Sequence, residues 1–211
     1  MNNICNSLHL FFSEMERLNF PFDTKKIHLN GIYILFEHDE KSHGVDRIVR
    51  IGTHTGENQL RSRLQQHFLR ENKDRSIFRK NIGRAILHRV KDPFLEQWNW
   101  DLTKREAKES LGKMVDRNKQ ENIEKQVTEY IQQKFSFAVF HVPEKEKRLS
   151  IESKIISTVS LCDVCTASSG WLGLHSPKRK IRESGLWQVN ELYKEPLSRE
   201  ELAEVKLFAI N

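Results

Sequence analysis

The sequence lacks long hydrophobic runs and is poor in cysteine. Only three of its 211 residues are cysteines, an odd and low number that does not describe the disulfide framework of a secreted domain. No segment approaches the roughly 20 apolar residues that a membrane-spanning helix needs. Phe11 and Phe12 are followed at once by glutamates and an arginine, which leaves no hydrophobic core for a signal peptide. These absences predict a cytoplasmic protein with no membrane partner.

Charge, by contrast, is abundant. Charged residues make up 30% of the chain and hydrophobic residues 37%, which predicts one real core beneath a heavily charged surface rather than a disordered chain. The formal net charge is +6, and the isoelectric point is about 9.2. A basic balance favours a polyanionic partner such as nucleic acid, but many soluble proteins are mildly basic, so charge alone is a weak indication.

Hydrophobic spacing predicts an α+β fold. Apolar residues recur at helical spacing in some segments, whereas β-branched and aromatic residues mark others as strands. The predicted order is helix, strand, strand, helix, helix, helical insertion, strand, helix and final helix, over residues 6–18, 27–37, 47–52, 57–70, 76–89, 93–128, 134–142, 145–161 and 198–208. The first two strands form a hairpin, and a long polar loop over residues 37–46 joins them.

We expect one domain over residues 1–211. Its core, residues 28–90 and 134–162, contains a small mixed or antiparallel three-stranded sheet flanked by helices. Residues 93–128 are the mostly helical insertion, and residues 163–211 form a C-terminal extension.

Five polar side chains occur on these elements in an order that suits phosphodiester chemistry. Tyr33 and Arg50 lie on the two hairpin strands, Arg63 and His67 lie one turn apart on the next helix, and Glu152 lies on the helix after the third strand. Cutting a phosphodiester needs an activated water and cations that stabilise the charge developing on the phosphoryl group. Taken singly, each side chain could equally be a solvated strand residue or part of the polar face of a helix.

Two motifs make the chain resemble the GIY-YIG nuclease superfamily. The first motif is complete as Gly31-Ile32-Tyr33. The second motif, which normally begins with a tyrosine, is Arg50-Ile51-Gly52 here, so Tyr33 is the only phenol left for the site. The motifs are 17 residues apart, a wider gap than is usual in the family, and a hairpin loop can absorb such an insertion.

The resemblance implies a metal-dependent endonuclease that uses Mg²⁺ or Mn²⁺. Tyr33 would be the general base, Arg63 would stabilise the phosphorane, and Glu152 would bind the metal. Arg50 and His67 complete the implied catalytic set, because Arg50 replaces the second tyrosine with a phosphate-binding cation and His67 follows Arg63 by four residues.

Further candidates lie outside the two motifs. His54 follows the second motif closely, although a neutral surface histidine is the alternative, and Asn190 is the one tail residue that could match the asparagine of the family. A basic run in the tail offers contacts for the phosphates of nucleic acid. Its members are Lys178, Arg179, Lys180 and Arg182.

The tail also holds tryptophans and two cysteines whose roles stay open. Trp171 and Trp187 flank the basic run and could stack on bases, or they could pack a small subdomain. The pair Cys162 and Cys165 is half of a zinc site, which His141 and His175 could complete; two reduced thiols are the alternative.

The sequence as a whole predicts an endonuclease that hydrolyses DNA phosphodiester bonds, with RNA as an alternative substrate. The competing hypothesis is a nucleic-acid-binding module that keeps the fold but does not cut, which the arginine at position 50 favours.

Overall fold

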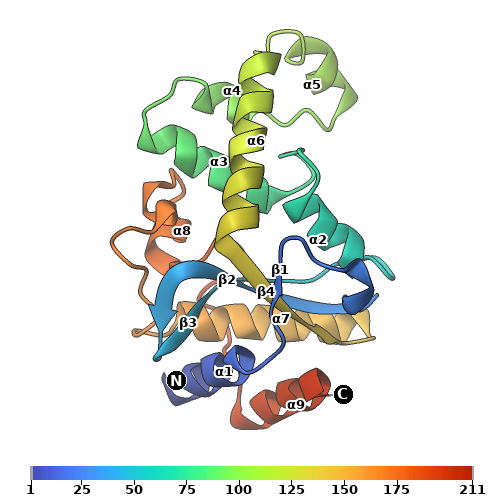
Figure 1. The fold of residues 1–211 in the computed structure, drawn as a ribbon, viewed down its shortest axis with the longest axis vertical. Helices are drawn as coiled ribbons and strands as arrows, with labels where there is room; N and C mark the ends of the chain where they lie inside the picture. Colours follow the sequence, from blue (N-terminus) through green and yellow to red (C-terminus); the bar gives the residue numbers. More distant parts are fainter. Residues whose placement is uncertain (1, 211) are drawn as a thin grey trace.

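The computed structural model describes residues 2–210 and confirms an α+β fold (Figure 1). The strands are β1 (Leu18–Asn19), β2 (Gly31–Ser42), β3 (Val45–Gly52) and β4 (Phe135–His141). The α-helices are α1 (Asn2–Ser13), α2 (Leu60–Phe68), α3 (Ile77–Arg89), α4 (Leu95–Asn99), α5 (Arg105–Ser110), α6 (Arg117–Lys134), α7 (Lys145–Ser160), α8 (Arg179–Ser184) and α9 (Arg199–Ile210). Two short 3₁₀ turns, η1 (Thr24–Lys26) and η2 (Leu172–His175), complete the elements.

The sheet has the strand order β1-β4-β2-β3, and every pairing is antiparallel. Tyr33, near the start of β2, lies opposite Gly52 on β3 and Val139 on β4. The expected count of three strands was one short. β1 is only two residues long, so it carries no alternating pattern that the sequence could reveal, and the helix predicted over residues 6–18 already ends at Ser13.

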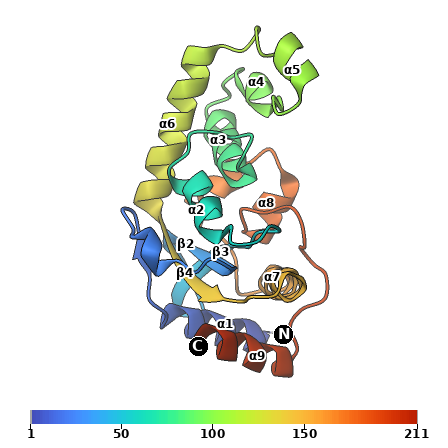
Figure 2. The same ribbon diagram turned by 90° about the vertical axis from the view of Figure 1, so that its right-hand side faces the viewer.

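The apolar residues of the central strands separate into two cores, one on each face of the sheet. Tyr33 and Leu35 of β2 pack with α2, α3 and α6, whereas Ile32 and Ile34 pack with α1, α7 and α9. Successive side chains of a strand point to opposite faces, which explains why a strand covered on both faces is apolar without a break. The layers are visible in Figure 2, where α1 and α9 lie side by side beneath the sheet and α2, α3 and α6 lie above it.

The prediction of a long polar loop between the hairpin strands is wrong. β2 and β3 continue to a tight turn at His43 and Gly44, whose φ angles of 53° and 79° both lie in the left-handed region. The pairing contains two register shifts, one just before this extension and one within it. Its two glutamates are buried because other side chains bind them. Glu40 pairs with Arg47, and Glu37 accepts hydrogen bonds from side chains of the C-terminal tail.

Two predicted helix starts are confirmed in detail. Ser76 caps α3 by accepting a hydrogen bond from the backbone N–H of Arg79. Ser198 and Glu201 form the reciprocal capping box of α9, with distances of 2.9 and 3.2 Å between each backbone nitrogen and the other side chain. Between residues 93 and 134 the chain forms α4, α5 and α6, and α6 leads directly into β4. No helix among residues 2–210 is both long and apolar enough to cross a bilayer.

Candidate active site

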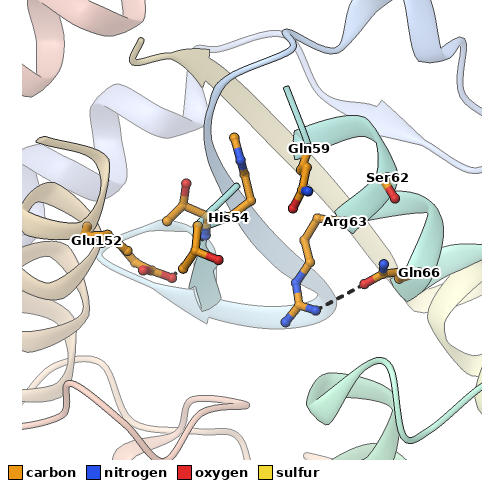
Figure 3. Close-up of a pocket in the computed structure, with 9 residues that line it drawn as sticks. His54, Gln59, Ser62, Arg63, Gln66 and Glu152 are labelled. Carbon is orange, nitrogen blue, oxygen red and sulfur yellow. Dashed lines mark hydrogen bonds between the residues drawn. The ribbon is translucent and has the colours of Figure 1, made fainter. Parts of the chain in front are cut away.

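A polar cleft opens beside the end of β3, between α2 and α7. One part is lined by the chain just after β3 and by one face of α2 (Figure 3). A second part extends toward α3 and the tail segment 188–191. The two parts share Thr55, Arg63, Leu149 and Glu152, so they form one continuous cleft.

Tyr33 lies behind this cleft with a side chain that is 0% exposed. Its phenol oxygen lies 2.8 Å from Nε2 of His67 and accepts a hydrogen bond of 3.3 Å from Nε of Arg50. The structure therefore brings three of the predicted site residues into contact, and one of them, Arg50, also lines the cleft.

The two motif glycines are explained by close approaches to other atoms. A Cβ atom on Gly52 would lie 2.1 Å from the phenol oxygen of Tyr33, so only glycine leaves room for that ring. A Cβ atom on Gly31 would lie 2.1 Å from the carbonyl oxygen of Phe140 on β4. Both glycines thus allow packing that any larger residue would disturb.

His67 is completely buried and is oriented through its second ring nitrogen. Nδ1 lies 2.7 Å from Oγ of Ser76, the residue that caps α3. Burial, together with the nearby charge of Arg63, Arg50 and Arg79, holds the pKa of His67 well below its ordinary value of 6.5. The imidazole is therefore neutral near pH 7, which leaves one ring nitrogen able to accept a proton.

α6, the helix before β4, supports His67 through Arg79 of α3. Nη1 of Arg79 donates to the backbone oxygen of His67 at 3.1 Å. Nη2 and Nε of the same guanidinium both donate to Oε2 of Glu124 on α6, at 2.8 and 3.1 Å, and this ion pair is buried. Residues of the predicted insertion thus contribute to the position of a site residue.

Arg50 is buried, with a relative exposure of 6%, so the alternative of a solvated strand residue is wrong. Besides the phenol of Tyr33, its guanidinium contacts the backbone oxygen of Trp187 at 2.6 Å. Arg63 reaches the cleft from α2, and its Nη1 donates to Oε1 of Gln66 at 3.3 Å and to the backbone oxygen of Arg75 at 3.2 Å. Two guanidinium groups therefore face one cleft.

Glu152 enters the cleft from α7, opposite these cations. Its Oε1 accepts a hydrogen bond of 3.0 Å from the backbone N–H of Thr53, directly after the second motif. Burial raises the pKa of Glu152 from 4.5, whereas Arg50, the Thr53 N–H and Arg63 act in the opposite direction. A carboxylate beside hydroxyl and amide side chains is a hard-oxygen set that suits Mg²⁺ or Mn²⁺, with water filling the remaining positions.

The two further candidates also lie at the cleft. His54 is 5% exposed and lines the first part, where its Nδ1 bonds the backbone oxygen of Gly56 at 2.6 Å. It is thus not the surface histidine of the alternative reading, and burial lowers its pKa from 6.5. Asn190 lines the second part together with Arg50, Arg63 and Glu152, so the structure brings this tail residue to the same cleft.

The basic run lies around α8. Nζ of Lys180 is 3.3 Å from the backbone oxygen of Val189, which lines the cleft. Arg179 pairs with Glu183 at 2.6 Å, and Arg182 donates to the backbone oxygen of Ser176. All four basic side chains of the run are exposed: Lys178, Arg179, Lys180 and Arg182.

The tryptophans flanking this run cannot stack on bases, because both are buried. Trp171 is 2% exposed and Trp187 is 0% exposed. Their Nε1 atoms donate to the same oxygen of Glu37, at 2.7 and 2.8 Å. The alternative that they pack the tail is confirmed, and they attach it to the extended hairpin.

Sequence reasoning missed three residues that hold the site together. Thr53 binds the carboxylate of Glu152 through its backbone N–H and donates its hydroxyl to the Gly31 carbonyl at 2.6 Å. Ser76 was recognised only as a helix cap. Gln188 accepts a hydrogen bond of 2.7 Å from the backbone of Ile51, although it is 137 residues away. The place of Thr53 next to the second motif was the one available signal.

The fold and the cleft define an α+β protein with a charged site suited to a phosphate-bearing ligand. A family-wide sequence model described as a GIY-YIG domain matches residues 3–206, and the chain belongs to this family. GIY-YIG domains are in general nuclease domains that act on nucleic acid, typically with a divalent metal ion. No curated protein and no solved structure matches the chain significantly.

Proposed function

We propose that this protein is a divalent-metal-dependent endonuclease that hydrolyses phosphodiester bonds of DNA. One observation carries the proposal: Arg50, Arg63, Glu152 and Asn190 line a single cleft, and Tyr33 contacts Arg50 directly behind it. The cations and the carboxylate come from separate elements, β3, α2 and α7. A phosphodiesterase needs these groups in one place, whereas an ordinary polar surface has no reason to bring them together.

The two arginines would bind the scissile phosphate. Arg63 offers a planar fork that matches two phosphate oxygens, and it stabilises the charge that develops as the phosphorane forms. Arg50 is the bridge between the cleft and Tyr33. When a phosphate enters the cleft, the guanidinium of Arg50 would give up its hydrogen bond to the phenol for a stronger one to the anion. The phenol of Tyr33 would then be open to water.

Tyr33 and His67 would act as a pair in proton transfer. The phenol oxygen takes a proton from the attacking water while its own proton passes to Nε2 of His67, 2.8 Å away. This requires the tautomer in which Nδ1–H of His67 donates to Oγ of Ser76, at 2.7 Å. Burial lowers the pKa of His67, so its ring is unprotonated in the resting state and Nε2 is free to receive a proton.

Glu152 would hold the metal ion, with the Thr53 N–H fixing one of its oxygens. A divalent cation bound there supplies positive charge to the phosphate and to the leaving oxygen. Asn190 and the hydroxyl of Thr55 face the same cleft and would orient water or phosphate oxygens. Lys178, Arg179, Lys180 and Arg182 would contact the backbone of the DNA beyond the cleavage point.

The competing proposal is a binding module that does not cut. It is favoured by the 0% exposure of Tyr33 and by the bond that keeps Arg50 on the Trp187 carbonyl. Both proposals predict DNA binding, so only turnover separates them.

The test is incubation of purified protein with supercoiled plasmid in Mg²⁺, Mn²⁺ or EDTA. We expect nicking with either metal, no nicking in EDTA, and no nicking by Glu152→Gln even though it still binds DNA. The matched control is Glu146→Gln, which alters an exposed carboxylate on the same helix and should cut normally. A folded wild-type protein that binds plasmid but never nicks it would establish the binding module instead, and a parallel assay with single-stranded and duplex RNA would show whether RNA is the substrate.

A further inference from the structure

All three cysteines meet at a second site, which shares no residue with the lining of the cleft. Cys5 comes from α1, and Cys162 and Cys165 follow α7. His43, at the tip of the hairpin, reaches the same place, with its Nε2 3.4 Å from the sulfur of Cys162 and 3.4 Å from that of Cys165. The cysteines are free thiols in the structure.

The spacing of these atoms is that of a tetrahedral metal site. Zn–S bonds of about 2.3 Å and Zn–N bonds of about 2.0–2.1 Å place neighbouring ligand atoms roughly 3.4–3.8 Å apart. The sulfurs of Cys5 and Cys165 are 3.4 Å apart. The thiol of Cys162 also interacts with the thiols of both Cys5 and Cys165. Each of the three sulfurs and the imidazole nitrogen of His43 therefore contacts at least one other member of the set.

The surroundings hold the ligands in place. Cys5 is 0% exposed and Cys165 is 4% exposed. His43 lies in the tight turn of the hairpin, with its backbone in the left-handed region. Oγ of Ser42 donates to the sulfur of Cys165 at 3.4 Å, a contact that suits a thiolate.

His9 is a fifth group next to the cluster, and the ligand atoms of Cys5, His9, His43 and Cys165, a set without Cys162, all lie within 4.8 Å of one another. The backbone, however, already uses both ring nitrogens of His9. Nδ1 bonds the Cys5 carbonyl at 3.0 Å, and Nε2 accepts from the Ile48 N–H at 3.2 Å. His9 is therefore better placed to orient the site than to bind the metal.

The partners expected for the Cys162 and Cys165 pair are wrong. His141 stacks on His28, with ring centroids 5.5 Å apart, and the backbone oxygen of His175 bonds the ring of His88. His43 instead lies against the sulfurs of both Cys162 and Cys165. The true neighbours, Cys5 and His43, are more than 100 positions from Cys165 in the chain.

We propose that Cys5, His43, Cys162 and Cys165 form a structural zinc site. The site would join three segments that are distant in sequence: the N-terminal helix, the tip of the extended hairpin and the chain that leaves α7. Four protein ligands close the coordination sphere, which is typical of a structural rather than a catalytic zinc ion. Zinc bound there stabilises the folded chain, because the unfolded chain does not bring the four ligands together.

The test is the metal content of the full chain, purified under reducing conditions without an affinity tag. Native mass spectrometry and elemental analysis should find one zinc ion per chain. Replacing the metal with Co²⁺ should give the visible absorption of a tetrahedral thiolate complex, and removing it with a strong chelator should lower the melting temperature. A wild-type chain that carries no zinc and gives no such spectrum with Co²⁺ overturns the proposal, as does a mass lower by two hydrogens, which would reveal a disulfide.

Variants assign the ligands. Cys165→Ser and Cys162→Ser should each lose the bound zinc, whereas His141→Ala and Glu152→Gln should keep it. Retention of zinc in Glu152→Gln would exclude binding of that zinc at the cleft. His9→Gln should also retain zinc. Loss of zinc in His9→Gln together with its retention in Cys162→Ser would refute this ligand set. If the serine variants fail to fold, the Co²⁺ spectrum of the wild-type chain still decides whether thiolates bind the metal.

Discussion

The phenol oxygen of Tyr33 and Nε2 of His67 lie 2.8 Å apart, although 34 residues separate them in the chain. Neither side chain touches solvent, since both are 0% exposed. The room for this contact depends on Gly52, whose missing Cβ would occupy the position of the phenol oxygen. A strand residue and a helix residue of the GIY-YIG domain are thus joined by one buried hydrogen bond.

This coupling makes Tyr33→Phe the most direct test of the mechanism. The change deletes one hydroxyl and leaves the packing of β2 almost intact. We expect the single-turnover rate of DNA cleavage to fall by about 100-fold or more, the usual contribution of a positioned proton acceptor. Thermal melts supply the folding control. A near wild-type rate in a folded Tyr33→Phe protein would transfer the role of base to another group.

The low pKa of His67 predicts a dependence of stability on pH. Because the folded-state pKa lies well below 6.5, the unfolded chain binds the proton more tightly. The stabilising contribution is therefore complete above about pH 6.5 and is lost as the pH falls below it, at up to about 1.4 kcal/mol per pH unit for one proton. Urea unfolding between pH 7.5 and pH 5.5 should show a steeper loss for the wild type than for His67→Gln. Equal slopes would mean that His67 does not carry this effect.

The buried pair of Arg79 and Glu124 should make cleavage activity depend on α6, the helix before β4. Glu124→Ala leaves the guanidinium of Arg79 without its buried partner, so we expect a loss of about 3–5 kcal/mol in the free energy of unfolding. The milder Glu124→Gln should keep the fold and reduce cleavage, because Arg79 also bonds the carbonyl of His67. Glu129→Gln, an exposed change on the same helix, should alter neither property. Unchanged activity in a folded Glu124→Gln protein would disprove the coupling.

DNA affinity should fall steeply as salt rises, since each phosphate that a cation neutralises releases a counterion. Replacing Lys178 and Lys180 with alanine should reduce the slope of log affinity against log salt concentration by about 0.9 for each duplex phosphate that the variant no longer neutralises. Arg199→Ala is the matched control, because that exposed cation begins α9, in the layer beneath the sheet. Fluorescence anisotropy with a labelled duplex measures both slopes. A slope that stays the same in the double variant would remove α8 from the interface.

Much of the molecule was predictable from local patterns in the sequence. Helical spacing located α2, α3 and α7, and the capping residues Ser76 and Ser198 marked where α3 and α9 begin. Such features depend on neighbours within one turn of the chain, so the residues that decide them stand together in the sequence. The two tripeptide motifs, together with Arg63, His67 and Glu152, likewise identified the family.

Only the tertiary structure decided which distant groups satisfy one another. Glu37 looked like the start of a solvated loop, but two indole N–H groups from the tail bind its carboxylate and allow the hairpin to extend. Cys165 contacts Cys5 and His43 rather than His141 and His175, the two histidines considered from the sequence. A buried polar group must find a partner, and the partner is whichever donor or acceptor the folded chain brings within reach. For contacts that span more than 100 residues, no local pattern records that choice, because it is made by the packing of whole elements around the two cores.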